Sequence, residues 1–436
     1  MLLFSGMILL SFKIKSWWMT QNFFFFFFFF MYLKMPMFNY FLHVSYLFGM
    51  DMFSYLMFML SIWIISLVYI ASFNLKFYYY NYFNLLMFMF MYIFYFCFFV
   101  NNFILFYIFY EINLIPILIL IYGWGYQYER FKAGFYLLFY MIFFSLPFFI
   151  CLMILNNYYF FFIYYLDFNY EINYYYYFFF LKIFKVSMPL FMFHIWLPKA
   201  HVEAPFSGSM ILAGVMLKLG GFGIYRVLML IFKINLKFNF FFISLSLFGM
   251  FILSIVCFLQ SDLKILIAYS SVVHMGLVII GLLTYNFWGI LGSLVLMFGH
   301  GLCSSGLFCL SNICYLRFKS RSIFINSGLI NIFPYFSFWW FLLCSSNMSF
   351  PPSLNLFGEL FLLMSLMIWF DYFYYLYFLI MILMFLYSLY LYLYTQYGKI
   401  LFYMNYLIYI NLSEYFLLFL HWLPLNIIFL ILEFFI

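Results

Sequence analysis

Residues 263–284 read LKILIAYSSVVHMGLVIIGLLT, and residues 286–311 read NFWGILGSLVLMFGHGLCSSGLFCLS. Each run is long enough to cross a bilayer, because a transmembrane helix needs about 20 mostly apolar residues. Each run also carries a histidine near its middle, His274 in the first and His300 in the second. The two runs therefore predict neighbouring membrane-spanning helices that each place a titratable side chain inside the membrane.

The rest of the chain has the same character. Hydrophobic residues make up 70% of the 436 residues and charged residues only 7%, whereas a soluble domain carries about 25% charged residues. These charges are too few to cover a water-facing surface, so the solvent must be lipid. We therefore predict an all-α polytopic membrane protein with about fourteen spans. The expected spans are 2–16, 17–34, 52–72, 83–100, 102–122, 132–154, 174–196, 206–229, 239–259, 263–284, 286–311, 324–369, 372–395 and 415–435.

Prolines interrupt two of these spans. The seventh contains Pro189 and is followed by Pro198 and Pro205, and the twelfth contains Pro334 and the Pro351-Pro352 pair. Irregular backbone inside a membrane must be buried in protein or line a watery cavity. Broken helices in corresponding halves of a transporter mark its ion path.

The two interrupted spans lie five spans apart, which predicts two five-helix repeats. The expected division is 1–80 for the first three spans, 81–235 and 236–398 for the repeats, and 399–436 for the last span.

The distribution of basic residues predicts the orientation. Loops after odd-numbered spans carry eleven of them: Lys13, Lys15, Lys76, Arg130, Lys132, Lys199, Lys264, Arg317, Lys319, Arg321 and Lys399. Loops after even-numbered spans carry three: Lys34, Lys233 and Lys237. The positive-inside rule places the odd loops on the inner side and both termini on the outer side. Lys199 and Glu203, spaced i, i+4, are expected to order the loop after the seventh span.

Five charged residues fall well inside predicted spans, namely Glu111, Lys182, Lys185, Lys218 and Glu359. An ionisable group at the middle of a membrane costs at least about 2.5–3.5 kcal/mol, so its presence indicates function. The competing interpretation is that some of these residues form structural ion pairs. Burial disfavours the charged form of either group, and a nearby charge then decides where the proton resides. Coupled acid–base pairs in series can thus pass a proton without redox chemistry.

The histidines have polar neighbours on their own predicted helices. Ser270 and Ser271 lie within one turn of His274, and Ser293, His300 and Ser304 share a face. This arrangement favours a proton relay, although a lone membrane histidine is often a structural residue. Glycines at 292, 299 and 306 repeat every seven residues and predict a helix-packing face.

Other classes of site have no support in the sequence. The seven cysteines contain no CxxC pair, so we expect small buried thiols, without disulfides or a metal site. No phosphate-binding glycine loop or dinucleotide fingerprint is present, and no cleavable presequence is visible. The basic residues exceed the acidic ones, but they form no cluster that would indicate binding of nucleic acid.

Several motifs identify a family. They are WLPKAHVEAP at 196–205, SMILAG at 209–214, LKLGG at 217–221, SDLK at 261–264, AYSSVVHMG at 268–276 and GHGLCSSG at 299–306. In these residues the chain resembles subunit 4 of respiratory complex I, the mitochondrial NADH:ubiquinone oxidoreductase, one of its antiporter-like membrane subunits. The match is specific from about residue 105 to 310 and thinner outside.

The resemblance implies a fold of fourteen transmembrane helices with two inverted five-helix repeats. It implies a proton-translocating subunit in the mitochondrial inner membrane, with both termini towards the intermembrane space. Glu111, Lys218 and Glu359 would lie on a central proton axis with His274 and His300 nearby. NADH, flavin, iron–sulfur clusters and ubiquinone would bind other subunits. The expected partners are membrane-arm subunits, phospholipids and internal waters, and this chain would hold no redox active site.

One position departs from the family pattern. The family places a lysine seven residues before His194, and here that residue is Ser187. Lys185 lies two residues earlier, about 200° round a helix. Three explanations stay open: Lys185 or Lys182 substitutes, Ser187 holds a water at an uncharged site, or a mitochondrial codon for lysine has been translated as serine.

Two other functions also stay open. The chain could be a free-standing secondary cation/proton antiporter, or a structural membrane subunit whose channel conducts nothing.

Overall fold

The computed structural model describes residues 16–33, 48–73, 79–158, 186–230, 232–370, 372–399 and 409–430. Within these ranges the chain is helical, and its extended contacts are the isolated bridges between Phe48 and Val100 and between Asp262 and Ser322. The helices are α2 (Trp17–Tyr32), α3 (Met52–Ala71), α4 (Tyr80–Phe99), α5 (Phe103–Ile112), α6 (Leu114–Trp124), α7 (Arg130–Tyr158), α9 (Trp196–Glu203), α10 (Phe206–Ile211), α11 (Leu217–Leu230), α12 (Phe232–Phe258), α13 (Leu263–Thr284), α14 (Phe287–Phe318), α15 (Leu329–Ile332), α16 (Pro334–Asn347), α17 (Leu354–Trp369), α18 (Phe373–Gln396) and α19 (Leu412–Ile427). One π-helical turn, η2 (Leu212–Met216), joins α10 to α11.

Ten helical segments in the described ranges are long and apolar enough to cross a membrane. In this count α5 and α6 form one segment, and so do α10, η2 and α11. The predicted all-α polytopic class is therefore confirmed. The expected span 2–16 lies outside the described residues, and the total of fourteen stays a prediction.

The twelfth predicted span is interrupted as expected. Helix α16 ends at Asn347 and α17 begins at Leu354, with non-helical backbone between them. In the seventh span, residues 186–187 are helical, turns follow, and α9 begins at Trp196. The Trp196 indole donates a hydrogen bond of 3.0 Å to the Val186 carbonyl and so closes this break. The first part of that span lies outside the described residues.

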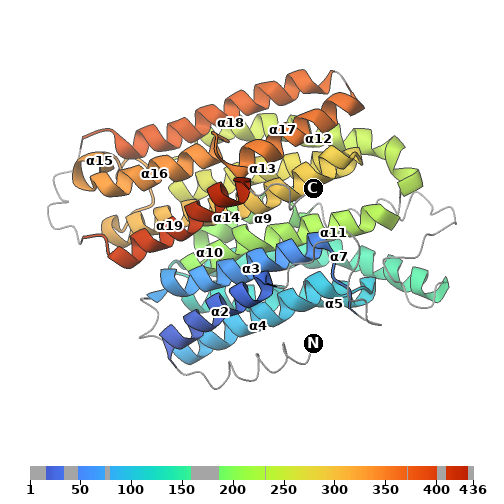
Figure 1. Ribbon diagram of the computed structural model, residues 1–436, viewed down its shortest axis with the longest axis horizontal. Coiled ribbons are helices and arrows are strands. Elements are labelled where there is room, and N and C mark those ends of the chain that lie inside the picture. The colour runs from blue at the N-terminus through green and yellow to red at the C-terminus, as the bar shows by residue number, and fades with distance from the viewer. Residues whose placement is uncertain are drawn as a thin grey trace.

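The helices lie side by side in an elongated bundle (Figure 1). Helices α2, α4 and α5 form one edge, α17 and α18 form the opposite edge, and α14 runs between these groups. At 32 residues α14 is about 48 Å long. Every residue of its membrane-spanning apolar stretch is buried. It packs against α3, α13, α16, α17 and α19.

The predicted glycine face of α14 is a packing face. Gly292 meets α17 so closely that an added Cβ would lie 3.1 Å from the Gly358 carbonyl oxygen. Gly299 faces Asn355 on the same helix, and Gly306 faces Leu343 on α16. Because these glycines carry no side chain, α14 and α17 approach each other closely.

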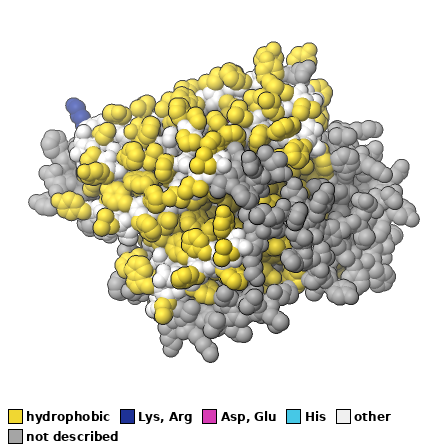
Figure 2. All heavy atoms as spheres, in the orientation of Figure 1, with side chains coloured by type: hydrophobic (Ala, Val, Ile, Leu, Met, Phe, Trp, Pro, Cys, Tyr) yellow, Lys and Arg dark blue, Asp and Glu magenta, His cyan; other side chains and the backbone are white. Residues whose placement is uncertain are grey.

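The outer surface is apolar. In Figure 2, hydrophobic side chains cover most of the described part of one face, and within that part Lys or Arg is visible at the edge. Phe139, Phe143 and Phe248 are more than half exposed, at 64%, 70% and 57%. Large apolar side chains facing outward over whole helices are what lipid-facing helices require. The polar side chains described next are buried instead.

Candidate functional site

The π-helical turn η2 places Lys218 in the middle of the bundle. The Lys218 side chain is completely buried. Its ammonium donates to the Ala213 carbonyl at 2.5 Å and lies 3.0 Å from His300 Nδ1. A π turn shifts the backbone hydrogen-bonding register by one residue and occurs preferentially at functional sites. The carbonyl that holds the lysine belongs to this turn.

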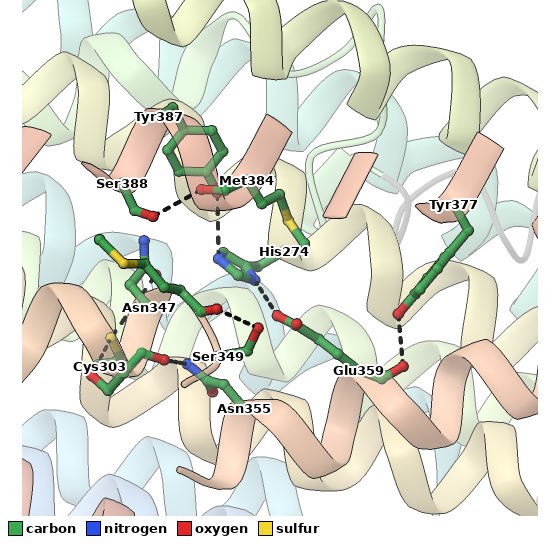
Figure 3. A network of polar contacts seen from close by, with 12 residues as sticks. His274, Cys303, Asn347, Ser349, Asn355, Glu359, Tyr377, Met384, Tyr387 and Ser388 are labelled. Carbon is green, nitrogen blue, oxygen red and sulfur yellow. Dashed lines mark hydrogen bonds and ion pairs between the residues drawn. The ribbon is translucent and has the colours of Figure 1, made fainter. Parts of the chain in front are cut away.

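Two histidines continue from Lys218 to a carboxylate. The rings of His300 on α14 and His274 on α13 have centroids 5.3 Å apart. On the other side, His274 Nδ1 lies 3.6 Å from Glu359 Oε1 on α17 (Figure 3). All four side chains are at most 2% exposed. Lys218, His300, His274 and Glu359 therefore form a continuous buried series across four helices, and we call it the central series.

Two tyrosines from α18 fix one end of the central series. The Tyr387 hydroxyl lies 3.4 Å from His274 Nε2, the ring nitrogen that faces away from Glu359. The Tyr377 hydroxyl donates to the backbone carbonyl of Glu359 at 2.7 Å. Figure 3 shows both contacts. The sequence analysis missed these residues. With 45 tyrosines in the chain, no pattern distinguishes these two.

The serines beside the histidines are engaged by their own helices. Ser270 and Ser271 donate to backbone carbonyls three residues earlier, at 2.7 and 2.6 Å, and Ser304 donates to the His300 carbonyl at 2.6 Å. Such local bonds are common for serine inside helices. The members of the central series contact one another through the histidine rings, not through these serines.

Asn355 lies four residues before Glu359 on α17, and its amide nitrogen donates to the Ser346 carbonyl at 2.9 Å. This amide nitrogen therefore binds backbone and not the Glu359 carboxyl group.

Glu111 lies on α5 and is partly buried. Within the described residues it forms no hydrogen bond or ion pair with Lys218. Its neighbour Tyr110 lies near Ser187, and Ser187 packs directly on Gly220 of α11. Position 187 thus lies between the helix of Glu111 and the helix of Lys218.

Lys182 and Lys185 lie outside the described residues. The structure therefore assigns neither of them to a place in or near the central series.

A buried ion pair escaped the sequence analysis. Arg226 on α11 contacts Asp51, the N-cap residue of α3, at 2.5 Å, and both side chains are at most 7% exposed. Arg226 also lies over the Phe222 ring, 4.7 Å from its centroid. The available signal was an arginine inside span 206–229 and an aspartate one residue before span 52–72. Two opposite charges at such places indicate a pair that joins two helices.

The i, i+4 spacing led us to expect a pair between Glu203 and Lys199, but each contacts a different residue. Glu203 lies 3.8 Å from Arg321, and the Lys199 ammonium lies over the Tyr136 ring, 3.7 Å from its centroid. Burial raises the pKa of the Glu203 carboxyl above its usual value, and Arg321 opposes that shift. Both residues order the segment, but each does so through a partner on another element.

Comparisons with known proteins agree with this architecture. A family model described as "NADH:quinone oxidoreductase/Mrp antiporter, TM" matches residues 100–386. A model described as "NADH-ubiquinone oxidoreductase chain 4, amino terminus" matches residues 1–100. NADH-ubiquinone oxidoreductase chain 4 of Locusta migratoria is 51% identical over 323 residues, which cover 73% of this chain and 72% of the relative. The same protein of Ceratitis capitata is 50% identical over 319 residues, with coverage of 73% and 72%.

Solved structures share the fold. A chain of respiratory complex I from Thermus thermophilus gives a TM-score of 0.85 at 21% identity, covering 94% of this chain and 90% of that one. A chain of the Mrp complex from Dietzia sp. gives 0.74 at 16% identity, covering 81% and 68%. On the matched family models and the half-identical relatives, the chain belongs to the NADH-ubiquinone oxidoreductase chain 4 family, the proton-translocating, multi-pass subunits of the membrane arm of respiratory complex I.

Proposed function

We propose that the chain carries protons through the membrane along the central series of Lys218, His300, His274 and Glu359. The observation that supports this proposal is the unbroken run of buried titratable side chains, with gaps of 3.0 Å and 3.6 Å at its two ends. Glu111 would extend the route from α5 by way of position 187. Helices α11, α13 and α17 all pack on α14, which carries His300, so a change of charge at one member would act on the next.

The chemistry requires no redox group on this chain. A buried charge is costly unless a neighbour compensates it. When a proton moves on or off one member, the charge that its neighbours experience changes, and coupled groups then titrate together. A conformational or electrostatic signal at one end can thus drive a proton along the series. Redox energy released elsewhere in the assembly would supply that signal.

The proposed setting follows from family membership. The chain would act within NADH:ubiquinone oxidoreductase beside other membrane-arm subunits, phospholipids and internal waters. NADH, flavin, iron–sulfur clusters and ubiquinone would bind elsewhere in the assembly. Residues 81–235 and 236–398 would form the two inverted repeats, each with one broken helix. Both termini would face the intermembrane space, because the basic loops favour the matrix.

A substitution of Lys218 tests the function. We expect the complex with Lys218→Met to assemble, because methionine has a similar length. It should lose most of its proton pumping, because methionine carries no charge and no transferable proton. The matched control is Lys399→Met, since Lys399 is exposed and distant in sequence from the series. Pumping is measured with a pH-sensitive dye in proteoliposomes energised with NADH and a quinone. Normal pumping by assembled Lys218→Met would contradict the proposal.

A free-standing cation/proton antiporter is the second candidate, because the chain also shares its fold with a chain of the Mrp complex. Purification separates the two functions. A subunit of the oxidoreductase is recovered only in a large assembly with NADH-oxidising activity, whereas an antiporter exchanges cations without it. The third candidate, a structural subunit, predicts normal pumping in the Lys218→Met complex.

A further inference from the structure

A charged cavity opens at one end of the bundle. Its volume is about 890 Å³, and it lies among the start of α7, helix α9 and the segments before α13 and after α14. Seven charged residues line it: Lys132, Lys199, Lys319, Arg321, Glu129, Glu203 and Asp262. They come from loops that follow odd-numbered predicted spans, which the basic residues assign to the matrix side. A cavity of this size and polarity holds water.

Lys264 lies directly behind the wall of this cavity. Val202 and Asp262 line the cavity, while Lys264 is only 4% exposed. The Lys264 ammonium donates to the Ala204 carbonyl at 3.2 Å and lies 3.5 Å from the Val202 carbonyl. These carbonyls belong to the end of α9 and to the break before α10. The lysine of α13 thus binds the backbone at the point where the helix is interrupted.

Helix electrostatics make this contact significant. Lys264 is in the first turn of α13, where the partial positive charge of the helix terminus disfavours a cation. The last carbonyls of α9 carry the opposite partial charge and lack helical partners. The Lys264 ammonium therefore neutralises part of the negative partial charge at the end of α9. The α9 carbonyls in turn stabilise a positive charge that the N-terminus of α13 destabilises.

The segment that Lys264 binds also carries a buried histidine that packs on α14, the helix of His300. His201 on α9 is 1% exposed and stacks on Phe308 of α14 with ring centroids 4.7 Å apart and planes at 8°. Burial lowers the pKa of His201 below its usual value, and the positive charges of Lys264 and Lys218 lower it further. Within the described residues, His201 Nδ1 and Glu203 Oε2 are buried without a hydrogen-bond partner. Both atoms belong to α9, beside the carbonyls that Lys264 binds.

We propose that Lys264 is a positioning residue for proton uptake, which fixes the α9–α10 break and thereby controls passage from the charged cavity to the central series. The inference rests on the proposed function, since it assigns the uptake end of that route. Lys264 would act through the Val202 and Ala204 carbonyls and thereby on the side chains of His201 and Glu203 in the same segment. Losing the ammonium releases the break and misaligns both side chains.

The test compares variants of the assembled complex for NADH-driven electron transfer and for protons pumped per electron. Lys264→Met should lower the number of protons pumped per electron at least twofold while electron transfer continues. Lys264→Arg keeps the charge and the donors, so it should restore pumping. Lys399→Met is the control for basal activity.

Assembly is checked on native gels, because a purely structural role would reduce the amount of complex and leave pumping per electron unchanged. If Lys264→Met does not assemble, Lys264→Gln serves as the second variant, since its amide donates to one carbonyl without a charge. Assembled Lys264→Met or Lys264→Gln with normal protons per electron overturns the inference. Glu359→Gln, measured in parallel, separates the two proposals: if it loses pumping and the Lys264 variants do not, only the inference about Lys264 fails.

Discussion

The sharpest prediction concerns the carboxylate at the end of the central series. In Glu359→Gln the side chain keeps its shape, and the Tyr377 hydroxyl keeps its acceptor because that acceptor is the backbone carbonyl of residue 359. The substitution removes the ionisable carboxyl group whose Oε1 lies 3.6 Å from His274 Nδ1. Packing of α17 on α14 should therefore survive, and the complex should assemble.

The structure gives the size of the effect. Two unit charges separated by 3.6 Å interact with a free energy on the order of 5 kcal/mol at an effective dielectric constant of about 20. Removing one charge thus lowers the equilibrium constant for proton binding at His274 by up to about three powers of ten. Relaxation and water reduce that figure, so we expect coupled turnover to fall at least about tenfold.

The assay is NADH:quinone turnover and proton pumping in proteoliposomes with a measured amount of assembled complex. Glu414→Gln is the matched control, because Glu414 pairs with Arg317 and its side chain is 19% exposed. The control should pump normally. An assembled Glu359→Gln complex with the pumping rate of the control would refute the role of Glu359 and the electrostatic argument behind it.

Four further outcomes are expected. Glu111→Gln should impair pumping while assembly survives, and normal pumping in the assembled variant would contradict its place on the route. Peptide mass spectrometry over residues 186–193 should decide whether position 187 is lysine, and a clear serine would end the codon explanation. Asp51→Asn should destabilise the folded subunit by about 3–5 kcal/mol, because it removes the carboxylate from a buried ion pair with Arg226, and native gels would show less complex. Protease added to the matrix side should cut between Arg317 and Arg321, whereas cleavage from the outer side of intact inner membranes would reverse the proposed orientation.

Much of the fold could be predicted because lipid imposes a simple rule. Each run of about 20 apolar residues must be a helix, and residues 263–284 are the whole of α13. Helix ends were less predictable. The span expected to end at residue 311 continues as α14 to Phe318, since polar residues near a helix end are compatible with a helix that extends beyond the hydrocarbon. Periodicity likewise identified the glycine face of α14.

The members of the site could be predicted, but their contacts could not. A charge inside an apolar run is visible in the sequence, so Lys218 and Glu359 were identified. Which groups touch depends on how four helices rotate about their axes, and hydropathy contains no information on that rotation. The partners Tyr387 and Tyr377 come from a helix whose tyrosines face several directions, and Asp51 pairs with Arg226 across 175 positions of sequence.

The surroundings of Lys218 support the proposed proton route. In the described part of the chain, its ammonium is bound by a carbonyl and by a histidine nitrogen, and it forms no ion pair with an Asp or Glu. A buried cation beside a carboxylate is held firmly, and separating the two is costly. A cation beside a carbonyl and a titratable ring is compensated only in part, so on the proposed route charges further along the series would decide whether it keeps its proton. The π turn that aims the Ala213 carbonyl at this ammonium would then stabilise the buried lysine without the firm hold of a carboxylate.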